Sequence, residues 1–428
     1  MPACAVPPGS PTGRGTRPTM NIRRTAALVG ATVVIGSACV PAAVADSASP
    51  SPKVVVPSGL YGTADPTYDG VWRQSLALVA QDTVGVKPAD KAVAWLAGQQ
   101  CANGGFAAFR AEPGKECDKK TVVDSNSTAA AVQALVAVGG REGEVTRGVD
   151  WLKKAQNGDG GWGYNVGMDS DANSTAVVIG ALVAAGEKPA DVKSGRGKTG
   201  QDALALLALP CSEGKDGGAL AYQPDKQGKL AANADATAAG VLGGLGTGLA
   251  PGKGKAPDSY VCKDGTTPDA LAHNAAVYLQ TQLSTRLYLK AVTPGSTKSQ
   301  PDYGNTADAV TSVAAAEGVK YTKDPYVWLE KNAGAWAEQS GPAAYAQLIF
   351  AAHATGNDPR DFGGTDLVKA LNATGPAPSS TKAATADEKK DKKKDDGGGI
   401  SVWYVVAVAA VAGIGIGFLF SGRKKQQL

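Results

Sequence analysis

The sequence predicts an all-α fold, built from repeated helix pairs and followed by one C-terminal transmembrane helix. First, apolar Ala/Val/Leu runs led by polar residues recur between about residues 63 and 374. Second, each run is followed by another helical stretch that ends in glycines, and strand patterns are almost absent. Third, an uninterrupted apolar run covers residues 400–420. About five to six helix pairs fit either an open solenoid or a closed ring of paired helices.

The N-terminal region, residues 1–45, has the pattern of a signal peptide whose true start is Met20. Arg23 and Arg24 form a positive segment, residues 26–40 are weakly apolar, and residues 43–45 give a small-residue cleavage site. An uncut N-terminal anchor and lipidation at Cys39 are the alternatives. Residues 46–62 then form a linker, and we expect the chain to be exported.

The first helix of each unit opens with a polar cap. The segments begin at Asp124 ("DSNSTAAAVQALVAVGG"), Asp171 ("DANSTAVVIGALVAAGE"), Asn233 ("NADATAAGVLGGLG") and Asn305 ("NTADAVTSVAAAEG"). Asn126, Asn173 or a neighbouring Ser or Asp can accept a hydrogen bond from the first helical turn. Apolar residues recur at three- and four-residue steps, which predicts that each helix turns one side toward a core.

The second helix of each unit ends in a glycine turn. Examples are residues 91–109, 147–164 and 201–222, with glycine pairs at 104/105, 160/161 and 217/218. Glycine gives the backbone the freedom to stop a helix and turn sharply. Phe106 and Trp162 are 56 residues apart, and Ala219, the expected matching position, follows 57 residues later.

The C-terminal region predicts a membrane anchor. Residues 375–399 are rich in Lys and Asp and form a charged, flexible linker. Residues 400–420 are long enough to cross a bilayer as a helix, and the basic tail 421–428 follows. Basic residues beside a span stay in the cytoplasm, so residues 63–374 are expected to face outward at the cell surface.

The charge of the predicted ectodomain argues against a nucleic-acid partner. The formal net charge of +4 includes seven Arg and Lys residues at the two ends of the chain, so residues 46–396 carry a net charge of −3. A mildly acidic domain lacks the basic surface that nucleic acids require.

Four cysteines remain after removal of Cys4 and Cys39 with the signal peptide. An even number of cysteines in an oxidising compartment predicts two disulfides. Three connectivities are possible, and the sequence-local one is favoured, pairing Cys101 with Cys117 and Cys211 with Cys262. No CxxC spacing is present, which argues against a zinc site.

The segment "QNGDGGWG", residues 156–163, resembles the Gln/Trp repeat of squalene and hopene cyclases and of the related protein prenyltransferases. The resemblance covers essentially the whole predicted ectodomain and implies an α/α toroid, in which inner and outer helices alternate around an axis. The "NSTA" openings followed by "ALVA" are most similar to bacterial secreted relatives of intrinsic factor and transcobalamin, the cobalamin carriers.

The resemblance also argues against an enzyme. Class II cyclases carry an Asp-x-Asp-Asp-Thr-Ala motif whose middle Asp protonates the substrate, and "DANSTA", residues 171–176, aligns with it. Asn173 stands where the proton donor belongs, and an amide is not a strong acid. The prenyltransferase zinc site needs Asp, Cys and His, but His273 and His353 lie on apolar helices and are expected to be packing residues.

The candidate binding site is the mouth at which the N-termini of the cap-led helices gather. Polar caps and nearby aromatic residues would give a concave small-molecule site, and helix N-termini favour a phosphate or carboxylate on the ligand. The simpler interpretation is that the caps only cap, and that Trp162 is a structural staple held with Gln156 at the turn. The candidate ligand-binding residues are Phe109, Asp124, Asn126, Trp162, Tyr164, Asp171, Asn173, Tyr222, Asn233, Asp235, Tyr303 and Asn305.

The sequence therefore predicts a non-catalytic, membrane-anchored capture protein without a cofactor, and the resemblance implies cobalamin or a related corrinoid as its ligand. The vertebrate carriers close over the corrin with a second domain, so a partner protein or a transporter is expected to complete the site. Two alternatives stay open: a terpenoid or prenyl-processing enzyme with a relocated active site, and a protein-interaction scaffold at the cell surface.

Overall fold

The computed structural model describes residues 55–291 and 300–381. The predicted signal peptide, the transmembrane helix at 400–420, the basic tail and most of the charged linker lie outside these residues. Within the described part, no helix combines the length and apolar character needed to cross a membrane.

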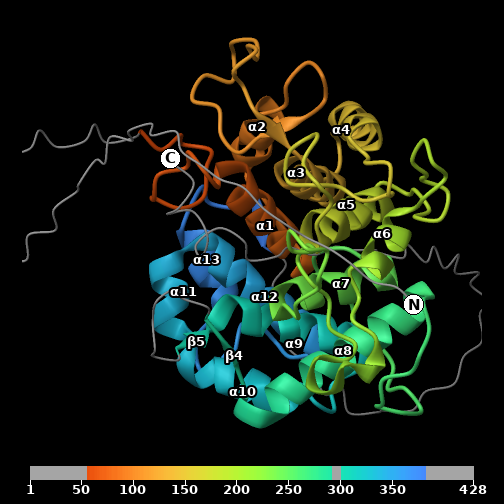
Figure 1. Cartoon of the computed structure of the whole chain (residues 1–428). Coiled ribbons are helices and arrows are strands. Elements are labelled where there is room, and N and C mark those ends of the chain that lie inside the picture. The colour runs from red at the N-terminus through yellow and green to blue at the C-terminus, as the bar shows by residue number, and fades with distance from the viewer. Residues whose placement is uncertain (1–54, 292–299, 382–428) are drawn as a thin grey trace, which may run out of the picture. The chain divides into compact units, whose positions relative to one another are not determined.

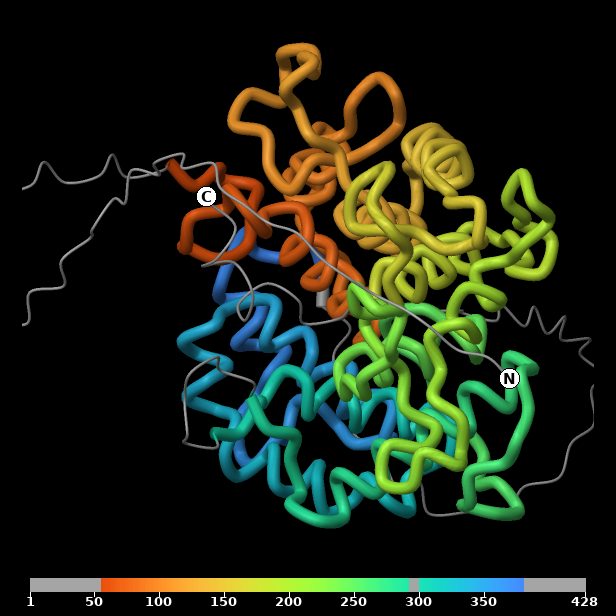
Figure 2. Tube along the Cα trace, in the orientation of Figure 1, coloured from red at the N-terminus to blue at the C-terminus, as the bar shows by residue number. Residues whose placement is uncertain are grey.

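Six helices form a closed inner ring. Each packs against the next along the chain, and the last packs against the first, which completes the circle (Figures 1 and 2). The prediction of an all-α fold is confirmed, and the helix pairs close into a ring and do not form an open solenoid. The inner helices are α1 (Gly70–Thr83), α3 (Ser125–Val138), α5 (Ala172–Ala184), α7 (Ala234–Leu245), α9 (Tyr303–Glu317) and α12 (Pro342–Thr355).

The outer helices cover this ring, and six of them complete helix pairs with the inner ones. Each outer helix turns an apolar face toward the inner ring. On α4, for example, Trp151 and Leu152 are buried while Glu142 is exposed. The short α11 is inserted between α10 and α12. The outer helices of the described chain are α2 (Asp90–Gly98), α4 (Glu142–Lys154), α6 (Gly200–Leu206), α8 (Pro268–Arg286), α10 (Lys323–Asn332), α11 (Gly334–Ser340) and α13 (Leu367–Ala373).

Three two-residue antiparallel ladders, which the sequence pattern did not reveal, join the turns. β1 (Val86–Lys87) pairs with β6 (Ser380–Thr381), β2 (Phe106–Ala107) with β3 (Val123–Asp124), and β4 (Leu289–Lys290) with β5 (Pro301–Asp302). A segment this short cannot display the alternating pattern of a strand. The β1–β6 pair fastens the first helix pair to the end of the described chain.

Small residues let the inner helices pack closely and be buried on nearly all sides. On α3, every residue from Ser125 to Leu135 is buried. The loop after α7 enters the ring on the side where the inner helices end, and a Cβ at Gly180 would lie 2.8 Å from the Cα of Gly248. The backbone N–H of Leu249 donates to Gln133 Oε1 at 3.1 Å. The loop after α7 therefore fills the inside of the ring at the C-terminal ends of the inner helices.

In four of the inner helices, a threonine four residues after the N-cap fastens the preceding turn to the helix. The hydroxyls of Thr128, Thr175, Thr237 and Thr306 accept hydrogen bonds of 2.9–3.0 Å from the backbone N–H groups of Phe106, Trp162, Leu220 and Leu289. These bonds connect residues that the sequence separates by 13 to 22 positions. These hydrogen bonds identify equivalent residues in the four units more reliably than the spacing of residues in the sequence does.

This hydrogen bond corrects one predicted alignment, since Leu220 and not Ala219 occupies the position of Trp162. The turn glycine with positive φ is Gly104 or Gly160 in the first two units, both at +94°, but Gly218 in the third, at +83°. The third unit is therefore displaced by one residue relative to its glycine pair.

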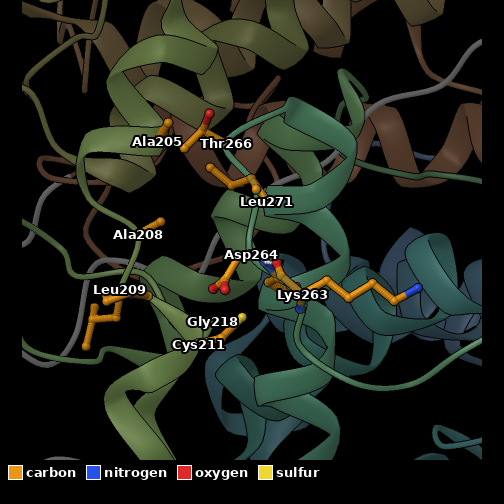
Figure 3. A pocket seen from close by; sticks show the side chains of 12 residues that line it. Ala205, Ala208, Leu209, Cys211, Gly218, Lys263, Asp264, Thr266 and Leu271 are labelled. Atoms are coloured by element: carbon orange, nitrogen blue, oxygen red, sulfur yellow. Dashed lines mark hydrogen bonds between the residues drawn. The ribbon is translucent and has the colours of Figure 1, made fainter.

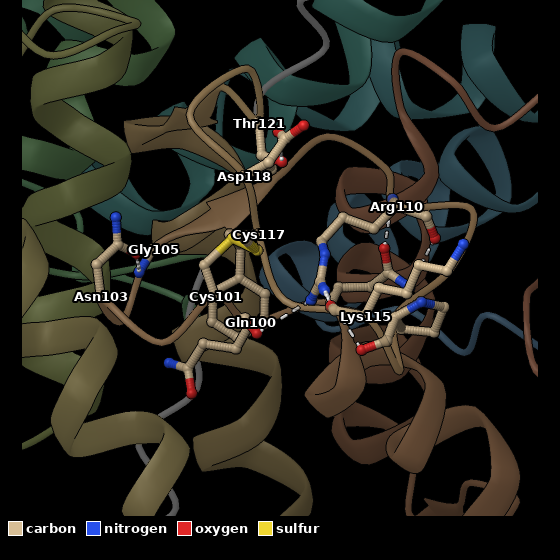
Figure 4. Close-up of a disulfide and its surroundings, with 12 residues drawn as sticks. Gln100, Cys101, Asn103, Gly105, Arg110, Lys115, Cys117, Asp118 and Thr121 are labelled. Carbon is tan, nitrogen blue, oxygen red and sulfur yellow. Dashed lines mark hydrogen bonds between the residues drawn. A yellow bond between two sulfur atoms is a disulfide. The ribbon is translucent and has the colours of Figure 1, made fainter.

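Both disulfides join the predicted cysteines. Cys101 pairs with Cys117, and Cys211, in the 3₁₀ helix η1 (Cys211–Asp216), pairs with Cys262. Figure 4 shows the first disulfide at the base of a loop that also carries Arg110. The Arg110 guanidinium donates to the carbonyl oxygens of Gly98 and Gln100 at 3.1 and 3.2 Å, so the loop is held by both covalent and polar contacts.

Candidate functional site

The N-caps of four inner helices are carboxylates or an amide whose side chains accept a backbone N–H of the first helical turn. Asp124, Asp171, Asn233 and Asp302 accept from the third helical residue at 2.7, 2.7, 2.9 and 3.0 Å. Asn126, Asn173 and Asn305 therefore do not cap their helices; they lie inside the first turn. Each cap therefore already satisfies one of the first-turn N–H groups that were predicted to bind an anionic ligand group.

The structure brings the starts of neighbouring inner helices together at one mouth. The N–H of Ser125 donates to the carbonyl of Tyr164 at 2.9 Å, and that of Ala172 donates to Tyr222 at 3.1 Å, each linking one helix to the segment before the next. The side-chain amide of Asn173 on α5 donates to Asp235 Oδ2 on α7 at 2.9 Å.

We define the mouth cluster as Asn173, Asp235, Asp302, Asn305 and Asp308. Asn305 donates to Asp302 Oδ2 at 2.8 Å, and the amide of Gln347 on α12 donates to Asp308 Oδ2 at 2.9 Å. The cluster thus spans three helices of the inner ring, α5, α7 and α9, and Gln347 connects it to α12. Asp302, Asp308 and Gln347 were not among the predicted site residues. For Asp308 and Gln347, the available signal was an acidic or amide residue within an otherwise apolar helix.

Several oxygen atoms at the mouth are buried and have no hydrogen-bond partner among the described residues. They are the Oδ1 atoms of Asn126, Asn173, Asp235 and Asn305. The side chains of Asn173 and Asn126 are only 1% and 5% exposed. A buried polar atom without a partner costs about 1–3 kcal/mol, so these acceptors favour contact with a donor.

Burial controls the electrostatics of the mouth. Burial raises the pKa of Asp235 well above its ordinary value, and Asp308 raises it further, while the bond from Asn173 opposes this shift. Burial also raises the pKa of Asp171 to about 6, although hydrogen bonds from Ser174 counteract it. The pKa of Tyr222 is raised by burial and by Asp171, with which Tyr222 shares a hydrogen bond.

Three of the predicted residues line an open groove at the edge of the mouth. Phe109, Asp124 and Tyr164 share this groove of about 730 Å³ with Tyr68 and Arg110. A second pocket, of about 280 Å³, lies beside Cys211 between α6 and α8, where Lys263 extends away from the other labelled residues (Figure 3). This second pocket contains none of the predicted site residues.

Trp162 belongs to the core and has no ring face available to a ligand. It is 1% exposed, and its indole N–H donates to the carbonyl of Leu152 at 2.7 Å. The Gln156 amide donates to the carbonyl of Gly160 at 2.8 Å, as predicted for the structural staple. The assignment of Trp162 as a ligand-binding residue is corrected, because the surrounding helices bury it completely.

One further predicted position differs from expectation. Tyr303 does not precede its cap but is the first residue of α9, where it stacks on Trp328 with ring centroids 5.4 Å apart. Asn233 caps α7, as expected, and is exposed.

The histidines lie within helices, as expected. His273 on α8 lies 2.6 Å from Glu317 Oε1, and His353 is part of α12. In the described part of the chain, no group of three or more His, Cys, Asp or Glu side chains is placed to hold a metal ion.

Comparison with known proteins gives no family assignment. No protein-family model matches the chain, and no curated protein matches it. Solved structures with partial similarity include a protein from Actinoplanes, at 15% identity and a TM-score of 0.45, with 71% of this chain and 96% of that one covered. They also include an ent-copalyl diphosphate synthase from Streptomyces platensis, at 16% identity and a TM-score of 0.41, with 67% of this chain and 50% of that one covered.

A sugar epimerase from a ruminal bacterium is similar at 14% identity and a TM-score of 0.40, with 64% of this chain and 80% of the epimerase covered. TM-scores and identities this low carry no conclusion about fold or activity. The description of the ring therefore rests on the helix contacts within this chain.

Proposed function

We propose that the chain is a non-catalytic ligand-capture protein that binds a small molecule at the mouth of its inner ring. The observation that carries this proposal is the set of buried oxygen acceptors without partners at that mouth. Binding sites combine concave walls with a few convergent polar groups, and unpaired acceptors supply the convergent part. The groove lined by Phe109 and Tyr164 supplies aromatic wall beside it.

Cobalamin or a related corrinoid is the ligand we propose to test first. The resemblance of the "NSTA" openings to the cobalamin carriers motivates this choice. The rim of a corrinoid carries carboxamide groups, whose N–H donors would match the acceptors of Asn126 and Asn173. Export and anchoring in the cell membrane remain predictions from residues that lie outside the described part of the chain, and a partner that completes the site remains a prediction from the resemblance.

Calorimetry tests this function directly. The purified full chain, with its disulfides intact, is titrated with cobalamin and cobinamide, and absorbance serves as a second readout. We expect saturable binding that weakens about tenfold in Asn173→Ala, because the ligand loses a buried polar contact. The matched control is Asn332→Ala, an exposed amide on outer helix α10. Absence of binding by a folded protein would exclude corrinoid capture by this chain alone.

An acid-catalysed enzyme acting on a terpenoid or prenyl substrate is the second candidate. Asp235 favours it, because burial and the neighbouring carboxylates raise the pKa of this group well above its ordinary value, which is the direction that a general acid requires. The test is turnover of a polyprenyl diphosphate. Turnover that is lost in Asp235→Asn or in Asp171→Asn would place this candidate above ligand capture.

A further inference from the structure

The mouth offers hydrogen-bond acceptors but few donors, and this imbalance defines the chemistry of its ligand. On the basis of the proposed function, we infer that the mouth cluster binds the ammonium group of an organic cation whose apolar body lies against neighbouring aromatic side chains. Three features of the mouth support this inference: the unpaired atoms, the charges around them and the aromatic rings beside them.

Among the described residues, the unpaired side-chain atoms of the mouth cluster are all oxygens. Asn173 uses its N–H donor on Asp235 Oδ2, which leaves its own Oδ1 buried and unpaired. Asp235 Oδ1 is also buried without a partner, and so is the Oδ1 of Asn305, whose N–H group is engaged by Asp302. An ammonium group carries three donors and no acceptor, so it matches such a set.

The charges favour a cation over an anion. The charged groups that act on Asp235 are the carboxylates of Asp308, Asp302 and Asp171. In the first turns of α5 and α9, Asp171 and Asp302 already accept from the N–H groups of Ser174 and Asn305, and their negative charges disfavour a phosphate or carboxylate. Hydrogen bonds between an ammonium group and a carboxylate are about twice as strong as neutral ones, which favours a charged amine over an alcohol.

Aromatic side chains lie on both sides of the cluster. On one side, Tyr222 is hydrogen-bonded to Asp171 and lies close enough to Asp235 and Tyr164 to interact electrostatically with both. On the other side, Tyr303 stacks between Trp328 and Trp336, with centroid distances of 5.4 and 5.8 Å. Rings of this kind attract cations and pack against apolar groups.

The stacked rings of Tyr303, Trp328 and Trp336 approach the mouth cluster next to Gly304. A Cβ built on Gly304 would lie 3.4 Å from Trp336 and 3.5 Å from the amide of Gln347, which itself holds Asp308. The side chain of Gln347 therefore lies between the indole of Trp336 and the carboxylate of Asp308. A ligand of matching shape would place an amine at Asp235 and Asp308 and an aryl or alkyl body toward Tyr303.

The test uses three probes of one shape and different charge: phenethylammonium, 2-phenylethanol and phenylacetate. Each is titrated by calorimetry into the full chain with intact disulfides. We expect phenethylammonium to bind at least about tenfold more tightly than 2-phenylethanol, and phenylacetate not to bind. Asp235→Asn should remove this preference, while Asp366→Asn, at the N-cap of outer helix α13, should preserve it. If Asp235→Asn does not fold, Asn173→Ser replaces it.

Equal binding of the three probes, or a preference that survives in Asp235→Asn, would overturn the inference. Failure of the inference is separable from failure of the proposed function. Corrinoid binding without ammonium binding would refute the inference alone, whereas Asp235-dependent ammonium binding without corrinoid binding would support it and exclude the corrinoid.

Discussion

The side-chain amide of Asn173 donates a 2.9 Å hydrogen bond to Asp235 Oδ2, so two residues 62 positions apart join the first turns of adjacent inner helices. Asn173 is the residue that stands in place of a proton donor in the sequence comparison with the cyclases. In the folded chain it holds the carboxylate of its neighbour. The same contact leaves one oxygen of each residue unpaired, and both proposals depend on these atoms.

Asp171 should make stability depend on pH. Its pKa is about 6 in the folded chain and 3.8 for the ordinary group, so the folded state binds the proton more tightly. A raised acid pKa gives stability that is present below about pH 4 and is lost as the pH rises to about 6, by up to about 3 kcal/mol. Urea denaturation across this range should show a smaller decline in Asp171→Asn, which retains an acceptor for the cap.

The comparison variant for this prediction is Asp366→Asn, which should follow the pH profile of the unaltered chain because Asp366 is on the outer helix α13. Identical pH profiles for Asp171→Asn and the unaltered chain would show that Asp171 does not retain its proton in the folded state.

The threonine that joins each turn to its helix should contribute to stability. Thr175→Val keeps the volume but leaves the buried N–H of Trp162 without its 3.0 Å acceptor, at a cost of about 1–3 kcal/mol. Thr146→Val is the control, since Thr146 is exposed on α4 and bonds only to a carbonyl of its own helix. Chemical denaturation gives both values, and equal effects of the two variants would refute a special role for Thr175.

The glycine turn should reject any side chain. In Gly160→Ala, the new Cβ would lie 2.2 Å from the carbonyl oxygen of Thr199, and φ is +94°. Gly186 has a similar φ of +86° but open space around it, so Gly186→Ala measures the backbone strain alone. We expect Gly186→Ala to cost about 1 kcal/mol and Gly160→Ala several times more. Similar melting temperatures for the two variants would contradict the predicted overlap.

The two disulfides should contribute unequally to stability. Cys211 and Cys262 close a loop with a sequence separation of 51, whereas Cys101 and Cys117 are separated by 16. Loop-closure entropy then predicts that the longer crosslink contributes about 1 kcal/mol more. Paired Cys→Ser variants, compared by denaturation under non-reducing conditions, provide the measurement. A larger loss for the Cys101–Cys117 pair would indicate that native contacts, such as those of Arg110, dominate over chain entropy.

Much of the fold follows from local patterns in the sequence. The capped apolar runs gave the inner helices α3, α5, α7 and α9, and the cysteine spacing favoured the observed pairing. The candidate site was predicted less well, since the positions of Trp162 and Tyr303 needed correction. The sequence around Trp162 is compatible with a ligand-binding ring, because it does not show that neighbouring helices bury this side chain.

The sequence by itself determined that the body of this chain is helical and repeated, because helix periodicity, polar caps and glycine turns act over a few residues. Only the tertiary structure decided that the repeat closes, since closure depends on α12 meeting α1 across the whole length of the body. It also decided that Asn173, Asp235 and Asp308 share one mouth. Long-range contacts and burial create both the cluster and its raised pKa values, and no local pattern records them.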